Sequence, residues 1–181
     1  MSTTAPDGTT LRDVVLARMR DVPDFPEPGV TFKDFSPLLA DGVAFAWLVD
    51  DVASRYAGRV DVVAGIEARG FILGAATAYR LGVGFVPVRK AGKLPSATHR
   101  LAYDLEYGSG VLEIHQDAFT PDARVLVMDD VLATGGTAAA TCELVELAGA
   151  VVVAVETVLE LAFLDGRSRL TGREVSSVVV V

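Results

Sequence analysis

Five short apolar runs, separated by helix-length segments, constrain the fold of this chain more than any other feature. Most of the runs are rich in valine and lack polar alternation, which is typical of strands buried on both faces of a parallel sheet. The runs are Val60–Ala64, Gly84–Val88, Val125–Met128, Val151–Val158 and Val175–Val180. Helix-length segments at 70–80 and 137–148 are each followed by a glycine near the expected C-cap, Gly82 and Gly149. The alternation predicts an α/β fold with an open, mainly parallel sheet flanked by helices.

The N-terminal quarter has a different pattern. Apolar residues recur at helical spacing from Leu11 to Val22, and Thr9 or Thr10 is placed to cap this helix. Four residues then oppose regular structure, so we expect an ordered loop or extended strip over 24–37: Pro23, Pro26, Pro28 and Gly29. A second helix is predicted from Asp41 to just before Gly58. The polar residues 1–10 are expected to form a flexible N-terminus.

Composition narrows the possible functions. The chain has 181 residues, a length that suits a single domain, 1–181. Its net charge of −8 argues against non-specific nucleic-acid or membrane-surface binding. One cysteine and two histidines make a disulfide framework or a zinc site improbable, so no protein-bound metal is expected. No secretory signal or spanning segment is evident, which leads us to expect a cytoplasmic protein.

One long segment, 90–110, does not fit the alternation of strands and helices. It contains four turn-favouring residues, Gly92, Pro95, Gly108 and Gly110, and only weak β patterning. Connections of this length in a compact domain often act as lids. We therefore expect a flexible lid loop.

The segment from Val125 to Thr137 carries the strongest chemical signal. A buried strand leads into Asp129 and Asp130, and a Thr-Gly-Gly-Thr turn then opens a helix. Ligands of parallel sheets bind at the carboxyl ends of strands, and helix N-termini favour anions. The turn therefore predicts a phosphate-monoester site, although a simple helix start with acidic caps fits the spacing too. A Walker A sequence is absent, which argues against a nucleoside triphosphate.

Two carboxylates beside a bound phosphate would repel it unless another group lies between them. A ribose fits, with its 5-phosphate in the turn and its hydroxyl groups donating to Asp129 and Asp130. Successive side chains of a strand point to opposite faces. Both carboxylates can therefore reach one sugar only if the chain is already turning at Asp130.

Several sequence blocks resemble a known family. The segment Asp129–Thr137 resembles the phosphoribosyl-pyrophosphate motif of the type I phosphoribosyltransferases. Further blocks, in the same order, are similar to the adenine phosphoribosyltransferases: Asp24–Asp34, Gly65–Phe71, Val88–Pro95, Leu105–Gly108 and Leu112–His115. Departures are small, such as Lys33 where arginine is common and Val131 where leucine is usual.

The resemblance implies transfer of a 5-phosphoribosyl group from phosphoribosyl pyrophosphate to adenine, giving AMP and pyrophosphate. It also implies Mg²⁺ carried by the pyrophosphate, and a homodimer. Residues 24–37 would form a small base-binding hood, and 90–110 the lid. A non-proline cis peptide is expected at Ala68–Arg69. The 5-phosphate would be held by Ala133, Thr134, Gly135, Gly136 and Thr137.

The remaining roles that the resemblance implies divide into three groups. Catalytic roles fall to Glu106, Asp129, Asp130 and Arg69, with Glu106 handling the adenine proton. Pyrophosphate would be bound by Ala68, Arg69, Lys90 and Lys93. Adenine would contact Thr31, Phe32, Lys33 and Val131, with Tyr107 in the lid.

Each role has an ordinary structural alternative. Arg69 would otherwise form a surface ion pair with Glu67, Phe32 a core contact, and Glu106 a solvated loop acid. Two other functions also remain open: a phosphoribosyltransferase for another base such as xanthine, or a non-enzymatic regulator that senses phosphoribosyl pyrophosphate.

Overall fold

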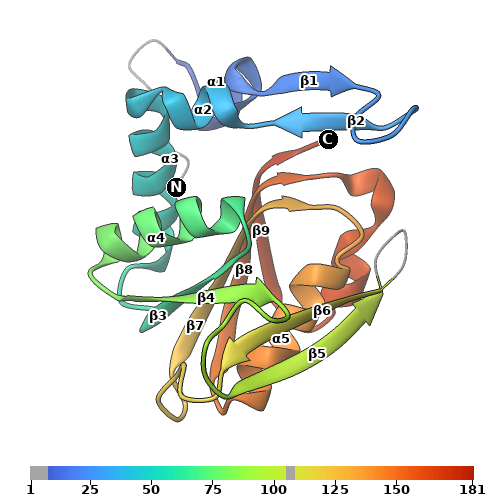
Figure 1. Ribbon diagram of the computed structural model, residues 1–181. Helices are drawn as coiled ribbons and strands as arrows, with labels where there is room; N and C mark the ends of the chain where they lie inside the picture. The colour runs from blue at the N-terminus through green and yellow to red at the C-terminus, as the bar shows by residue number, and fades with distance from the viewer. Residues whose placement is uncertain (1–7, 105–108) are drawn as a thin grey trace. The chain divides into compact units, whose positions relative to one another are not determined.

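The computed structural model describes residues 8–104 and 109–181, and the chain divides into two compact units, 1–55 and 56–181 (Figure 1). The described part of the first unit begins with helix α1 (Leu11–Arg18), followed by strands β1 (Arg20–Pro23) and β2 (Thr31–Asp34). Helices α2 (Ser36–Ala40) and α3 (Gly42–Tyr56) complete it, with α3 crossing the boundary between the units.

Local sequence signals explain this unit. Thr10 caps α1 in a reciprocal capping box with Asp13, so residue 10 belongs to a helix start rather than to a flexible tail. The helix ends at Arg18, earlier than its apolar spacing predicts, and Val22 instead pairs with Phe32 in the β1–β2 hairpin. The expected loop over 24–37 thus also contains β2 and the start of α2.

The second unit contains a seven-stranded sheet of order β5-β6-β4-β3-β7-β8-β9. Five neighbouring strands are parallel, which confirms the predicted fold class: β4 (Gly84–Lys90), β3 (Val62–Ile66), β7 (Arg124–Leu132), β8 (Val151–Glu160) and β9 (Glu174–Val180). Strands β5 (Thr98–Asp104) and β6 (Ser109–His115) add an antiparallel hairpin to the edge at β4.

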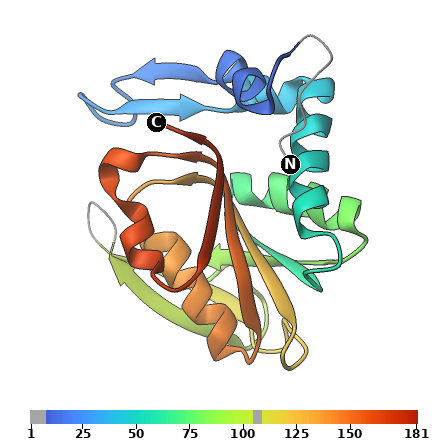
Figure 2. The ribbon, with the colours of Figure 1, turned by 180° about the vertical axis from the view of Figure 1, so that it is seen from behind.

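Helices cover both faces of this sheet (Figures 1 and 2). Helix α4 (Arg69–Leu81) packs on β3, β4 and β7, and helix α5 (Gly136–Leu147) packs on β5 to β8. The core on the α5 side joins Val125 and Val127 of the sheet to Leu144 and Val145 of the helix. Two short 3-10 helices, η1 (Ala162–Leu164) and η2 (Gly166–Leu170), link β8 to β9.

The expected lid range, 90–110, contains more regular structure than its sequence indicates. Residues 98–104 and 109–115 pair as the β5–β6 hairpin, and only 91–97 forms a described connection without strands. Burial in β6 does not follow a polar–apolar alternation, because the charged Glu113 is fully buried, as are its neighbours Leu112 and Ile114. A role as a lid stays a prediction.

The described residues can also be compared with two requirements, those of a membrane-spanning helix and those of a metal site. No helix within the described ranges has the length and apolar character that crossing a bilayer requires. Nor do three or more His, Cys, Asp or Glu side chains of these residues gather where they would hold a metal ion.

Candidate active site

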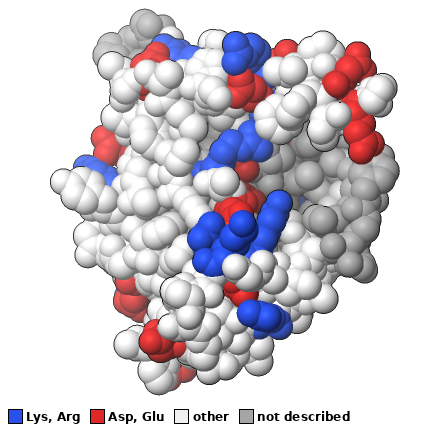
Figure 3. Space-filling view, viewed as in Figure 1, with Lys and Arg blue, Asp and Glu red and all other residues white. Residues whose placement is uncertain are grey.

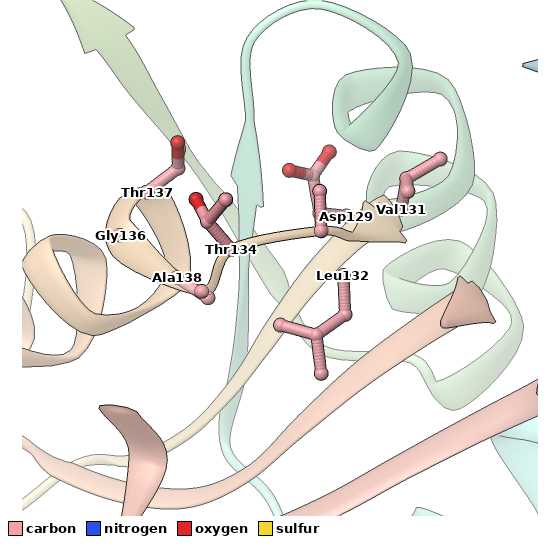
Figure 4. Close-up of a pocket in the computed structure, with 9 residues that line it drawn as sticks. Asp129, Val131, Leu132, Thr134, Gly136, Thr137 and Ala138 are labelled. Atoms are coloured by element: carbon pink, nitrogen blue, oxygen red, sulfur yellow. The ribbon is translucent and has the colours of Figure 1, made fainter. Parts of the chain in front are cut away.

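The turn between β7 and α5 forms a pocket of about 300 Å³, counted with its open mouth. Residues 131–138 and Asp129 line it. Figure 4 shows the hydroxyl groups of Thr134 and Thr137 on the same side of the chain as the Asp129 carboxylate, with Leu132 pointing away. Gly135 adopts the left-handed conformation, with φ of 79°, that lets the chain turn abruptly into α5.

The N-terminus of α5 is suited to an anion. Gly135 is its N-cap, and no described side chain forms a capping hydrogen bond there. The first backbone N–H groups of a helix have no partner within the helix, and they carry the positive end of its dipole. The turn therefore has N–H and hydroxyl donors on its open side, and phosphate binding there stays a prediction.

The two aspartates contact different neighbours. Strand β7 continues to Leu132, where it still pairs with Glu160 of β8, so the chain does not turn at Asp130. Asp129 lines the pocket, whereas Asp130 forms an ion pair with Arg69, with Arg69 Nε and Asp130 Oδ2 2.8 Å apart. Although alternate side chains of a strand point to opposite faces, the two carboxyl groups lie close enough for the charge of Asp130 to raise the pKa of Asp129. Their shared contact with one ribose stays a prediction.

Burial shapes the chemistry of Asp129. Enclosure by protein raises the pKa of the Asp129 carboxyl well above its ordinary value, and the charge of Asp130 adds to this. The carboxyl lies against the start of α4: a Cβ on Gly70 would lie 2.7 Å from the Met128 carbonyl oxygen and 3.0 Å from Asp129 Oδ1. Gly70 therefore lets the helix approach β7 closely enough to bring Arg69 beside Asp130.

The loop after β3 carries the second group of expected site residues. Ala68 is the N-cap of α4 and Arg69 its first residue. The non-proline cis peptide is Glu67–Ala68, one bond before the expected position, because Ala68–Arg69 already forms the helix start. The structural alternative for Arg69, an ion pair with Glu67, is not formed: Glu67 accepts from Arg89 Nε at 3.1 Å, and Arg69 pairs with Asp130.

Basic residues gather near the end of β4. Figure 3 shows Lys and Arg side chains clustered on this face, with acidic side chains between them. Lys90 ends β4, and Lys93 lies in the following connection; both are exposed. Arg89 Nη1 donates to the Lys93 carbonyl oxygen at 3.2 Å, which ties the connection to β4.

The expected adenine contacts fall in both units. Thr31, Phe32 and Lys33 lie on β2 in the first unit. There the Phe32 ring packs edge-to-face on Phe25, with centroids 5.2 Å apart, and Lys33 Nζ donates to Asp21 at 2.8 Å. Val131 lines the phosphate pocket in the second unit. Glu106 and Tyr107 lie outside the described residues.

Comparison with known proteins decides the family. A phosphoribosyl transferase domain model matches residues 39–177. An adenine phosphoribosyltransferase of Salinispora tropica is 57% identical over 96% of this chain and 93% of its own length. The chain belongs to the adenine phosphoribosyltransferase family.

Solved structures of the same family have the same fold. The adenine phosphoribosyltransferase of Thermoanaerobacter pseudethanolicus is 48% identical and matches with a TM-score of 0.89, over 92% of this chain and 98% of that one. The Saccharomyces cerevisiae adenine phosphoribosyltransferase, complexed with adenine and an imino-altritol bisphosphate, is 38% identical with a TM-score of 0.88, over 92% and 97% of the two chains.

Glu113, a buried acidic residue of this chain, is not among the site residues singled out from the sequence. Glu113 is fully buried on β6, and its Oε1 accepts from the backbone N–H groups of Lys93 and Leu94 at 2.8 and 3.0 Å. Arg100 Nε donates to Oε2 at 3.1 Å. These bonds hold the connection that presents Lys93. The available signal was a lone acid between the apolar residues Leu112 and Ile114.

Proposed function

We propose that the protein transfers the 5-phosphoribosyl group of phosphoribosyl pyrophosphate to N9 of adenine. The bond from C1 of the ribose to pyrophosphate breaks, the bond from C1 to N9 forms, and N9 loses its proton. The products are AMP and pyrophosphate. The observation that carries this proposal is the turn at Gly135, which no described side chain caps, with two threonine hydroxyls and Asp129 on its open side, in a chain of this family.

The turn would bind the 5-phosphate through Ala133, Thr134, Gly135, Gly136 and Thr137. Helix-terminal N–H groups and hydroxyls supply the hydrogen bonds that phosphate oxygens need. Asp129 would accept from a ribose hydroxyl on the pocket side. Asp130 would contribute negative charge near the ribose, and its ion pair with Arg69 would hold its carboxylate in place before substrate binds.

Cations would take up the charge that develops on the leaving pyrophosphate. Ala68 contributes backbone at the start of α4, and Arg69, Lys90 and Lys93 supply positive charge on the same unit. Mg²⁺ would arrive with the substrate and neutralise pyrophosphate oxygens. Such preorganised charge stabilises the transition state more than the ground state.

The remaining assignments rest on the resemblance. Thr31, Phe32, Lys33 and Val131 would contact adenine. Glu106 would take the adenine proton, and Tyr107 would belong to a lid over 90–110 that excludes water. Residues 24–37 would form the base-binding hood. A homodimer in the cytoplasm is also proposed, and sedimentation at a monomer mass would contradict the dimer.

An assay of base specificity tests the proposed function. The purified protein is incubated with phosphoribosyl pyrophosphate, Mg²⁺ and, in turn, adenine, hypoxanthine, guanine or xanthine, and nucleotide and pyrophosphate are measured. We expect AMP from adenine with kcat/KM at least about 100-fold above that of any other base, because unpaired polar groups penalise the wrong base strongly. A preference for xanthine over adenine would overturn the proposal. Binding of phosphoribosyl pyrophosphate without turnover of any base would overturn it too.

A further inference from the structure

A glycine distant in sequence lies directly behind the phosphate turn. Gly166 is buried at the start of η2, and its backbone contacts the turn at Ala133 and Gly135. A Cβ on Gly166 would lie 3.0 Å from the Gly135 amide nitrogen and closer still to the Ala133 carbonyl oxygen. A Cβ on Gly135 would in turn collide with the Gly166 carbonyl group. Each glycine therefore permits the approach of the other.

The position of Gly166 is fixed by the residue that follows it. Arg167 donates from Nε and Nη2 to the two carboxylate oxygens of Glu160, at 2.7 Å each, and from Nη1 to the Val175 carbonyl oxygen at 2.8 Å. Such bidentate pairs specify geometry as well as adding energy. Glu160 is buried at the end of β8, where it pairs with Leu132 at the end of β7.

Further contacts strengthen the Arg167–Glu160 ion pair, which is called the anchor below. Ser177 Oγ of β9 donates to Glu160 Oε2 at 3.0 Å and lies 2.8 Å from Thr157 Oγ1 of β8. The hydrogen bonds from Arg167 hold the pKa of the Glu160 carboxyl below its ordinary value, so it stays ionised at neutral pH. Gly166 is thus tied through Arg167 to the same strand ends that support the phosphate turn.

This contact determines where a donor of the turn points. The Ala133 carbonyl and the Thr134 N–H belong to one planar trans peptide and therefore point in opposite directions. A carbonyl held against Gly166 aims the Thr134 N–H away from η2. The geometry points to Gly166 as a positioning residue, which is held by the Arg167–Glu160 pair and sets the phosphate-binding orientation of the turn. This inference rests on the proposed function of the turn.

The direct test is Gly166→Ala. Gly166 lies outside the left-handed region, so alanine adds no backbone strain there and acts only through its contact with Ala133 and Gly135. We expect KM for phosphoribosyl pyrophosphate to rise about tenfold or more, since misplacement by about 1 Å at such sites is costly, with KM for adenine changed less than about threefold. Calorimetric affinity for ribose 5-phosphate should fall by a similar factor.

Gly84→Ala is the matched control. Gly84 is also outside the left-handed region, and a Cβ there meets only Val62 Cγ2 at an ordinary 3.6 Å. This variant should bind ribose 5-phosphate like the wild type. Wild-type affinity in Gly166→Ala, or an equal rise of both KM values in a folded variant, would overturn the inference.

A second pair of variants tests the anchor if Gly166→Ala does not fold. Arg167→Met should raise KM for phosphoribosyl pyrophosphate selectively, and Arg167→Lys should recover part of the loss. Arg173→Met is the control, because Arg173 Nη2 also donates to both oxygens of a glutamate, at 2.9 and 3.0 Å, and that glutamate, Glu146, is exposed on α5. Equal effects of Arg167→Met and Arg173→Met would refute the anchoring role. Failure of the proposed function itself would look different, because the wild type would then make no AMP.

Discussion

Replacing Gly70 by alanine tests how the start of α4 positions the acidic end of β7. A Cβ at Gly70 would lie 2.7 Å from the Met128 carbonyl oxygen, whereas ordinary contact begins at 3.4 Å, so helix and strand must separate by about 0.7 Å. The atoms that must move include backbone, and Asp129 Oδ1 at 3.0 Å moves with them. Separation also lengthens the Arg69–Asp130 contact.

The expected cost follows from that displacement. Misplacement by about 1 Å at a reacting centre can lower the rate by about 100-fold, so we expect kcat/KM of Gly70→Ala to fall by about 10- to 100-fold. Overpacking should also lower the free energy of unfolding by about 1–3 kcal/mol. Steady-state AMP formation and urea unfolding measure the two effects.

Gly74→Ala provides the comparison on the same helix. The three atoms nearest to a Cβ on Gly74 belong to Phe85, at 3.0 Å, Gly65, at 3.3 Å, and Val63, at 3.4 Å, rather than to the aspartates. This variant should lose stability while its kcat/KM stays within about threefold of wild type, because the reacting centre is not displaced. An equal loss of kcat/KM in both variants, or wild-type activity in Gly70→Ala, would refute the reasoning.

Three further predictions concern individual carboxylates. Asp129→Asn should lose activity yet raise the melting temperature of the ligand-free protein, because the raised pKa of Asp129 makes its ionised form costly in the fold. The gain should grow as pH rises from about 4, the ordinary pKa of aspartate, towards the higher folded pKa; thermal unfolding across pH measures it, and a less stable variant at every pH would contradict it. Asp130→Asn should retain the fold but lower kcat by about 100-fold, as expected when a preorganised charge beside Arg69 is lost, and near wild-type turnover would argue against its role. Glu113→Gln should destabilise the connection that carries Lys93. Although burial opposes ionisation, hydrogen bonds from the Leu94 and Lys93 N–H groups hold the pKa of Glu113 below its ordinary 4.5. The wild type should therefore be more stable than Glu113→Gln above that pH, and the difference in the free energy of unfolding should shrink as pH falls below it. Urea unfolding at pH 7 and pH 4 measures this difference, and a pH-independent difference would contradict the prediction.

The parallel part of the sheet and the phosphate turn were predictable because their signals are local. Buried valine runs mark strands, and the Thr-Gly-Gly-Thr sequence marks a sharp strand-to-helix turn. The β5–β6 hairpin was less predictable, because the burial of Glu113 depends on hydrogen bonds from Lys93, Leu94 and Arg100 that become apparent only after folding.

Long-range pairing explains the other differences. Sequence proximity offered a Glu67–Arg69 ion pair as the alternative to pyrophosphate binding, whereas the fold pairs Arg69 with Asp130 of β7. The contact of Gly166 with Gly135 likewise joins segments separated by all of α5 and β8. Neither pairing leaves a periodic signal in the sequence, since each arises where separate elements meet.

A crystal structure of the protein with AMP tests the central claim most directly. We predict phosphate oxygens within about 2.7–3.2 Å of backbone N–H groups of residues 133–137, the distance typical of such hydrogen bonds, with a ribose hydroxyl against Asp129. A phosphate bound elsewhere, with those N–H groups instead donating to protein atoms, would contradict the account.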